Sequence, residues 1–372
     1  MAKGLDVGTM FLVKAEEDEL VDGTGFTVER NVFLQAATTD DTEETLKENH
    51  WAYAKHDDEY YILGEDALKL KNLLTVGSKR ESDNIVMTKV GDLRRPMQNG
   101  ILNTSEEKLS IAIIQKIIAN LVGKPSQPNE VLCYCAPGDP VDSNLSVVFH
   151  KGILTKFLSS LGYHVECVPE ALAIIFSECP TVEDDAVDGG EAPFSGISFS
   201  FGAGMCNICF AYKKLPLIAF SVARSGDWID REASKVAGVD QAAMTRYKES
   251  HFDLNNVDYS NMKDAALDIF YSNMIEHALS NFSEKFNQLD RDSQTTAPLE
   301  IVVAGGTASI PGFLEKFKEV LSEKELPFNV KNVKMAAEPL YTVASGCLAK
   351  AISVENKKAK VEEPPAKPKK DK

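Results

Sequence analysis

Three glycine-containing segments, far apart in the 372-residue chain, constrain its fold more than any other feature. They span residues 4–9, 200–205 and 301–307. The first two predict a strand, a tight glycine turn and a second strand; the third predicts a buried strand that breaks at two glycines and enters a helix. Glycine turns let backbone N–H groups approach phosphate oxygens, and a helix start adds the positive end of its dipole. Ordinary hairpins also use glycine, so the order of the three segments is what indicates one nucleotide site.

Around these segments the predicted elements follow one order twice, with three strands, a helix, a strand and a helix. The first copy has strands at 5–14, 27–34, 60–64, 130–136 and 165–168, and helices at 65–73, after 104, at 143–161 and at 170–177. The second copy has strands at 197–201, 205–211, 217–221 and 301–304, and helices within 228–290, from 311 and at 340–352. A duplicated α/β unit places its two glycine turns face to face across a cleft. The sequence therefore predicts an α/β protein built from two similar units.

Several segments are expected to depart from this regular pattern. Residues 40–58 are polar and predict irregular structure, and the acidic, glycine-bearing stretch 183–191 is typical of an exposed loop. Residues 355–372 are mostly Lys, Glu and Pro, which predicts a disordered, solvated tail, with capture of a partner protein as the alternative. The residues Thr104-Ser105-Glu106-Glu107 predict a capping box at a helix start.

Composition excludes some classes of partner. The formal net charge of −16 argues against nucleic acid, which requires a basic face. No run of apolar residues is long enough to span a membrane, and the N-terminus enters a strand directly, leaving no room for a signal peptide. The seven cysteines lie in apolar segments, and Cys206 and Cys209 are expected on opposite faces of a strand. We therefore expect reduced thiols, a cytoplasmic protein and no indicated membrane contact.

Further segments strengthen a resemblance to a known superfamily. Residues 5–9 and 200–205 resemble the two phosphate loops of the actin, heat-shock-chaperone and sugar-kinase ATPases, and residues 303–312 resemble their adenosine loop. Residues 168–173 and 338–346 resemble the connecting helix and the final crossing helix. Within the superfamily, Arg95-Pro96-Met97 in the segment 94–102 is similar to the R-P-M-x-x-G segment of MreB. The chain thus resembles the bacterial actins of the MreB-like and MamK-like branch over about residues 4–352.

The resemblance implies an actin-like fold, in which two duplicated ribonuclease-H-like domains flank a nucleotide cleft. Domain I is expected at 1–169 and 339–354, with a small subdomain inserted at about 35–90. Domain II is expected at 170–338, and the tail at 355–372. The implied cofactors are ATP and Mg²⁺.

The resemblance also implies roles for single residues. Asp6 occupies the position of the carboxylate that holds Mg²⁺, mostly through water. Glu170 occupies the position of the glutamate that orients the attacking water; the alternative is a simple helix N-terminal carboxylate. For Lys248, which could reach the nucleotide from the opposite helix, a surface position is the simpler interpretation. The remaining candidate nucleotide contacts are Gly8, Thr9, Met10, Gly202, Ala203, Gly204, Gly305, Gly306 and Thr307.

The second phosphate loop departs from the superfamily pattern D-x-G-x-G-T. Ser200 stands at the Asp position and Met205 at the Thr position. Loss of the Asp removes a charge that binds Mg²⁺-held water, and loss of the Thr removes a hydroxyl near the γ-phosphate. Each lost partner is worth about 2–4 kcal/mol in the transition state, so weakened hydrolysis is expected while binding through backbone N–H groups survives.

Three classes of function follow from the resemblance. The favoured one is a cytoskeletal filament, in which ATP binding promotes head-to-tail stacking with other copies of the chain. A monomeric chaperone-like nucleotide switch is the second, although only the short tail follows the nucleotide-binding region. A small-molecule kinase is the third, although no kinase-type signature for a substrate base is present in the sequence.

Overall fold

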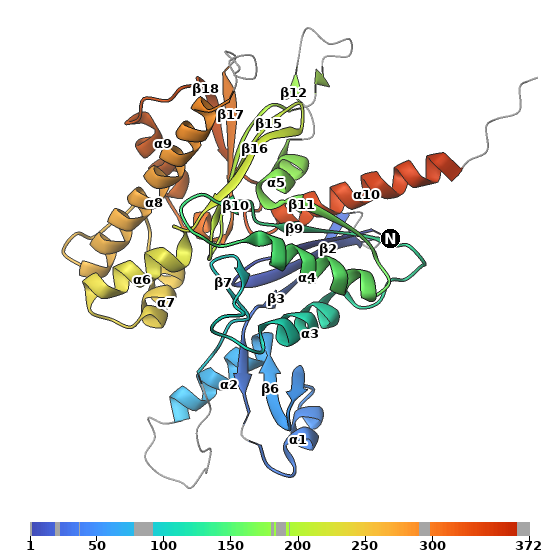
Figure 1. The fold of residues 1–372 in the computed structure, drawn as a ribbon. Coiled ribbons are helices and arrows are strands. Elements are labelled where there is room, and N and C mark those ends of the chain that lie inside the picture. The colour runs from blue at the N-terminus through green and yellow to red at the C-terminus, as the bar shows by residue number, and fades with distance from the viewer. Residues whose placement is uncertain are drawn as a thin grey trace, which may run out of the picture.

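The chain folds into two α/β bodies, seen in Figure 1 as the blue-to-green and the yellow-to-orange parts of the ribbon. The structure is a computed structural model that describes residues 2–18, 23–36, 38–77, 92–179, 182–183, 191–192, 194–289 and 298–362. All structural statements below concern these residues.

The two main sheets repeat one strand order. The first sheet has the order β11 (His164–Pro169), β9 (Val131–Ala136), β1 (Lys3–Val7), β2 (Phe11–Asp18) and β3 (Gly23–Arg30). The second has the order β18 (Val330–Met335), β17 (Leu299–Ala304), β14 (Gly196–Phe201), β15 (Cys206–Tyr212), β16 (Leu215–Val222) and β10 (Asp139–Pro140). In each sheet three antiparallel strands continue into two parallel ones, and β10 extends the second sheet at its edge. The predicted duplication is therefore confirmed.

The helices follow the same repeat. The helices α3 (Ser110–Val122), α4 (Val147–Ser160) and α5 (Glu170–Glu178) correspond in order to α8 (Met262–Asn287), α9 (Phe313–Ser322) and α10 (Thr342–Glu362). Two more helices, α6 (Gly226–Ala237) and α7 (Gln241–Ser250), precede α8. The helices α5 and α10 cross in the middle of the molecule, where α5 packs against β14 and β15 and α10 against β1 and β9 (Figure 1).

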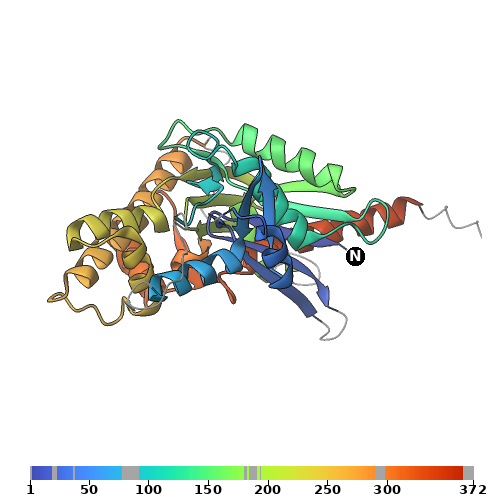
Figure 2. The same cartoon turned by 90° about the horizontal axis from the view of Figure 1, so that it is seen from below.

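A small subdomain lies below the first sheet in Figure 1 and therefore faces the viewer in Figure 2. Its sheet has the order β4 (Phe33–Gln35), β6 (Glu59–Leu63) and β5 (Tyr53–His56), with helices α1 (Thr42–Glu48) and α2 (Gly64–Gly77). A hairpin of β7 (Met97–Gln98) and β8 (Ile101–Leu102) follows it along the chain. The remaining elements are the paired short strands β12 (Val182–Glu183) and β13 (Glu191–Ala192) and the 3-10 helix η2 (Gly306–Ser309).

Aromatic packing covers one face of β14, a central strand of the second sheet. Phe199 and Phe201 alternate with small residues along β14 and point to the same face. Phe317 of α9 meets the Phe199 ring edge-on at 5.5 Å, and Phe313 meets the Phe201 ring at 5.2 Å. Every residue of β14 is buried, as expected for a central strand covered by helices on both sides.

Some local predictions were wrong. Residues 40–58 are not irregular but form α1 and β5, because Leu46 is buried in the small core with Leu34 and Ile62. The predicted capping box does not form: the Glu107 carboxylate accepts from the Leu109 N–H at 3.0 Å, and the helix begins only at Ser110. The strand expected at 27–34 is divided into β3 and β4, whereas the stretch 5–14 is divided at the predicted glycine turn into β1 and β2.

The tail prediction was wrong over part of its length. Helix α10 continues to Glu362, and the Glu355 carboxylate accepts the Val131 N–H at 3.1 Å, which ties the helix to the start of β9. Residues 363–372 lie outside the described residues, as does most of the loop expected at 183–191. Among the helices that the structure describes, none is long and apolar enough to cross a membrane.

The close crossing of α5 and α10 depends on Gly346, so a larger residue at this position is expected to lower stability. A Cβ at Gly346 would come within 1.8 Å of the Ala173 carbonyl oxygen, so the two helix backbones are in direct contact. We expect Gly346→Ala to lower the free energy of unfolding by about 2 kcal/mol, because the helices must separate. Gly152→Ala in α4, where a Cβ meets nothing within 4 Å, is the matched control and should be neutral or stabilising. Thermal denaturation of both variants tests this, and equal melting temperatures would contradict it.

Candidate functional site

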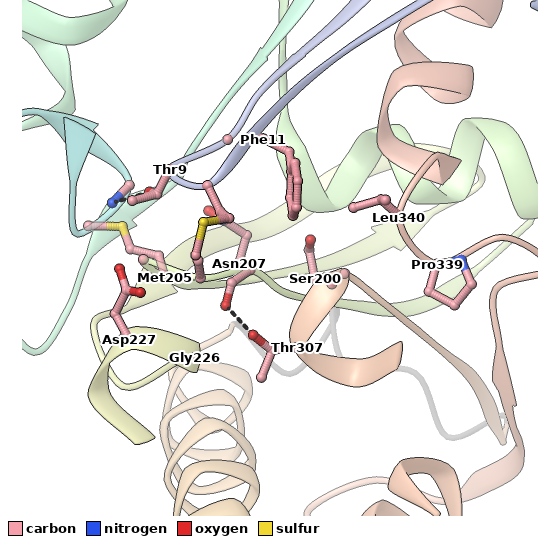
Figure 3. A pocket seen from close by; sticks show the side chains of 18 of the residues that line it. Thr9, Phe11, Ser200, Met205, Asn207, Gly226, Asp227, Thr307, Pro339 and Leu340 are labelled. Atoms are coloured by element: carbon pink, nitrogen blue, oxygen red, sulfur yellow. Dashed lines mark hydrogen bonds between the residues drawn. The ribbon is translucent and has the colours of Figure 1, made fainter. Parts of the chain in front are cut away.

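A pocket lies where the three glycine segments meet, and Figure 3 shows part of its lining. It encloses about 980 Å³ of space counted out to its open mouth. All the predicted site residues line it: Asp6, Gly8, Thr9, Met10, Glu170, Gly202, Ala203, Gly204, Lys248, Gly305, Gly306 and Thr307. The structure therefore brings together residues that are up to three hundred positions apart in the chain.

Two of the glycine segments form matching turns. In loop 1 (residues 8–11) the Gly8 N–H donates to the Phe11 carbonyl at 3.0 Å. In loop 2 (residues 202–205) the Gly202 N–H donates to the Met205 carbonyl at the same distance. Because each turn joins the first two strands of its sheet, the loops are equivalent in the duplication and face one pocket.

Loop 1 is held by a residue that the sequence analysis missed. Asn31, fully buried between β3 and β4, donates from Nδ2 to the Gly8 carbonyl at 2.9 Å. Its backbone N–H also donates to the Met10 carbonyl at 2.9 Å. A lone Asn after a strand carries no signal of its own, so only the folded arrangement reveals this contact.

The third glycine segment is joined to loop 2. The Thr307 hydroxyl donates to the Gly202 carbonyl at 2.8 Å, the contact dashed in Figure 3. Gly305 has a φ of 101°, and a Cβ there would lie 2.3 Å from the Phe201 carbonyl oxygen. The strand β17 thus ends in a turn that only glycine can make so close to β14.

Two carboxylates, Asp6 and Glu170, lie at the floor of the pocket. The Ser200 hydroxyl donates to Glu170 Oε1 at 2.7 Å, and the Asn207 amide donates to Oε2 at 2.9 Å. The Cys135 thiol donates to Asp6 Oδ1 at 3.2 Å. Both oxygens of Glu170 therefore have a neutral donor, and Glu170 has a fixed orientation.

Burial sets the charge state of this pair. Burial raises the pKa of Glu170 to about 8, and the neighbouring Asp6 carboxylate contributes to the rise. Burial likewise raises the pKa of Asp6 to about 6, against the opposing hydrogen bond from Cys135. In the absence of a cation, at least one proton is therefore held in the site near neutral pH.

Asn207 is a second residue that the sequence analysis missed. Its Oδ1 accepts from the Gly138 N–H at 3.0 Å, which fixes the amide so that its NH₂ group faces Glu170. It stands directly opposite Ser200 in the β14–β15 pairing. The register of the hairpin around loop 2 could have pointed to it, since residues 200 and 207 pair across that turn.

Lys248 is buried, so the expectation of a surface lysine was wrong. Its Nζ lies 2.7 Å from Asp230 Oδ1 within the pocket wall, and the residue is 7% exposed. Thr245, one turn earlier on α7, donates to the other Asp230 oxygen at 2.8 Å. Lys248 and Asp230 meet because α7 folds back on α6. The spacing of residues within α7 alone does not reveal this contact.

Met205 lines one edge of the pocket and is almost fully buried there. Its sulfur accepts from the Ser221 hydroxyl at 3.2 Å and also packs against Gly100. The side chain is 2% exposed and supplies no hydroxyl to the pocket. Loop 2 can therefore offer backbone groups to a ligand. Positions 200 and 205 provide a single hydroxyl, that of Ser200, and it already donates to Glu170.

The residues present fit a magnesium-bound nucleotide. Carboxylate oxygens are the ligands that Mg²⁺ prefers, and two facing buried carboxylates are stabilised by a nearby cation. In the part of the chain that the structure describes, no group of three or more His, Cys, Asp or Glu residues is arranged to hold a metal ion. Asp6, whose carboxylate lines the pocket, is the residue that would hold such an ion.

The fold and the pocket together define an actin-like protein, and comparisons agree. The structure is similar to a MamK double helical filament, with a TM-score of 0.64 and 17% identity over 94% of this chain and 98% of that one. It is similar to MreB5 of Spiroplasma citri bound to AMPPNP, with a TM-score of 0.61 and 14% identity over 97% of each chain. It also resembles the ethanolamine utilization protein EutJ from Carboxydothermus hydrogenoformans, with a TM-score of 0.50 and 13% identity over 94% of this chain and 89% of that one. These likenesses establish the actin-like fold.

The sequence itself places the chain more narrowly. The family model described as Volactin matches residues 1–351, and the chain belongs to this family. No curated protein matches it.

Proposed function

We propose that this protein binds Mg²⁺-ATP in the cleft and assembles with copies of itself into cytoskeletal filaments, in the cytoplasm. The observation that carries the proposal is the convergence of loop 1, loop 2 and the 305–307 turn on one pocket floored by Asp6 and Glu170. The structural relatives support it, because one is a filament of MamK and another is MreB5 with AMPPNP bound.

The roles of the residues follow from their chemistry. Backbone N–H groups of Thr9 and Met10 in loop 1, and of Ala203 and Gly204 in loop 2, donate to phosphate oxygens. The Gly8 N–H is used within its own turn, so Gly8 contributes a close backbone approach and no N–H donor. Asp6 holds Mg²⁺, which when bound neutralises part of the phosphate charge. The pocket wall around Gly305, Gly306 and Thr307, with Lys248 opposite, accommodates the nucleoside.

Hydrolysis is proposed to be slow. In this proposal Glu170 orients a water molecule and accepts its proton, but its high pKa keeps it protonated until a cation is bound. Ser200 donates to one Glu170 oxygen and adds no charge, and Met205 supplies no hydroxyl. The site thus retains the groups that bind phosphate and lacks two groups that would assist the attack.

Pelleting with negative-stain microscopy tests the proposal. Purified protein is incubated with ATP, AMPPNP, ADP or no nucleotide, and phosphate release is followed in the same tubes. Filaments with ATP and AMPPNP that persist with little phosphate release are expected. A protein that binds ATP but stays monomeric would contradict the filament proposal and favour a nucleotide switch or a kinase.

An acidic side chain at position 200, just before loop 2, is expected to speed hydrolysis. In Ser200→Asp a carboxylate returns beside Mg²⁺-held water, so phosphate release should rise about tenfold at saturating Mg²⁺-ATP. Ser200→Asn, which has similar size and no charge, is the matched control and should give no increase. Equal rates for the two variants would show that position 200 does not limit hydrolysis.

A further inference from the structure

The β7–β8 hairpin reaches the phosphate end of the pocket. Its turn is formed by Asn99 and Gly100, with φ values of 47° and 73°. The Gly100 N–H donates to the Thr9 hydroxyl of loop 1 at 3.0 Å. A Cβ on Gly204 of loop 2 would come within 2.4 Å of the Gly100 nitrogen, so no side chain separates them. The tip of the hairpin therefore touches both phosphate loops at once.

Arg94 and Arg95 lie at the base of this hairpin and attach it to two different parts of the molecule, the small subdomain and the second domain. The backbone of Arg94 exchanges two hydrogen bonds of 2.9 Å with Phe33 of β4. Its guanidinium lies 4.6 Å from the centre of the Phe33 ring and pairs with Glu107 at 3.3 Å. Arg94 thus fastens the segment to the small subdomain.

Arg95 points the other way, as successive residues of an extended segment do. Its Nη1 lies 2.9 Å from both carboxylate oxygens of Asp227, in the first turn of α6. Asp227 lines the pocket on the same side as Thr9 and Met205 (Figure 3). The Arg95–Asp227 pair therefore joins the small-subdomain side of the pocket to the second domain.

We propose that residues 94–102 are a clasp that closes the pocket over the terminal phosphate and makes the protein prefer nucleoside triphosphates to diphosphates. The proposal rests on the proposed nucleotide site. A triphosphate engages both loops beneath the Gly100 tip, whereas a diphosphate leaves the end nearest the tip unfilled. A ligand shifts the equilibrium between the open and closed states only if it binds the two states with different affinities. The contacts of the closed state must therefore favour the triphosphate.

Charge strengthens this coupling. Asp227 and the nearby Asp230 are both acidic residues of the pocket wall, and Asp230 is balanced by Lys248. Arg95 balances Asp227 in the same way. Without Arg95, the Asp227 carboxylate would repel the phosphates, and the more highly charged triphosphate would be repelled more.

Affinities for fluorescent ATP and ADP test the clasp. In Arg95→Ala the preference for the triphosphate should fall about fivefold, and the double variant with Asp227→Ala should be no worse than Arg95→Ala alone. Arg231→Ala is the matched control, because this exposed arginine of α6 pairs only with Glu232 among the ion pairs found. An unchanged preference in Arg95→Ala would overturn the proposal.

A second measurement does not depend on nucleotide. Spin labels introduced through unnatural amino acids at Glu48 of α1 and Lys235 of α6, both exposed, report the distance across the pocket. Arg95→Ala should shift this distance distribution to longer values in the nucleotide-free protein, and identical distributions would overturn the clasp. If the wild-type protein binds no nucleotide, the proposed function fails, whereas the label distances still decide whether Arg95 closes the pocket.

Discussion

Replacing Glu170 by glutamine is expected to lower phosphate release about 100-fold while nucleotide affinity stays within about twofold of wild type. Glutamine has the size of glutamate and can be held by the same two neighbours. Its carbonyl accepts from Asn207, and its NH₂ group donates to the Ser200 hydroxyl, which can act as an acceptor. Glutamine cannot accept the proton of an attacking water, so the loss falls on the chemical step.

Single-turnover phosphate release with saturating Mg²⁺-ATP measures this effect even when steady-state turnover is slow. Glu166→Gln on β11 is the control, because this residue is four positions away in sequence and pairs with His164 outside the pocket. Unchanged phosphate release in Glu170→Gln would show that Glu170 is only a carboxylate at the N-terminus of α5. The proposed attack would then have to be assisted by another group.

Stability of the nucleotide-free protein is expected to fall as the pH rises from about 4.5 to about 8. The ordinary pKa of a glutamate is 4.5, and burial raises that of Glu170 to about 8. Between these values the unfolded chain releases the proton freely while the folded protein retains it, so folding is favoured at the lower pH. The stabilisation that comes from the proton on Glu170 is fully present below pH 4.5 and is lost as the pH rises through 8. Asp6, raised to about 6, adds to the lower part of this range.

The expected loss is about 2–5 kcal/mol, measured by urea denaturation at several pH values in EDTA. Glu170→Gln should flatten the dependence, because glutamine has no proton to lose, and should therefore be more stable than wild type at pH 8. Added Mg²⁺-ATP should also reduce the loss in the wild type, since the cation stabilises the ionised carboxylates. Equal slopes for wild type and Glu170→Gln would contradict the assigned pKa.

The duplicated architecture could be predicted because it depends on local signals. Gly305 has a φ of 101°, which glycine adopts at little cost, and a Cβ at Gly8 would lie 2.6 Å from the Phe11 carbonyl oxygen. Gly8 and Gly202 begin turns at equivalent points of the two sheets. The site residues predicted from the resemblance all line the pocket for the same reason. Their individual roles in binding and hydrolysis remain predictions.

The errors arose where a contact distant in sequence outweighed a local pattern. Lys248 looked like a surface residue because the partner that buries it, Asp230, lies on another helix. The capping box at 104–107 failed because Glu107 is used by Arg94, from the segment before it. Asn31 and Asn207 carry no local signal of function, and they matter only because the fold places their amides against loop 1 and Glu170.

The crossing helices bear on how such a molecule could have arisen. Helix α5 follows the last strand of the first sheet yet packs on β14 and β15, and α10 follows the last strand of the second sheet yet packs on β1 and β9. The final helix of each repeat therefore packs on the sheet of the other repeat. A single ancestral repeat could have achieved the same burial only by exchanging this helix with a second copy. The internal symmetry is therefore what a helix-swapped homodimer would leave behind after its gene was duplicated and the two copies were fused.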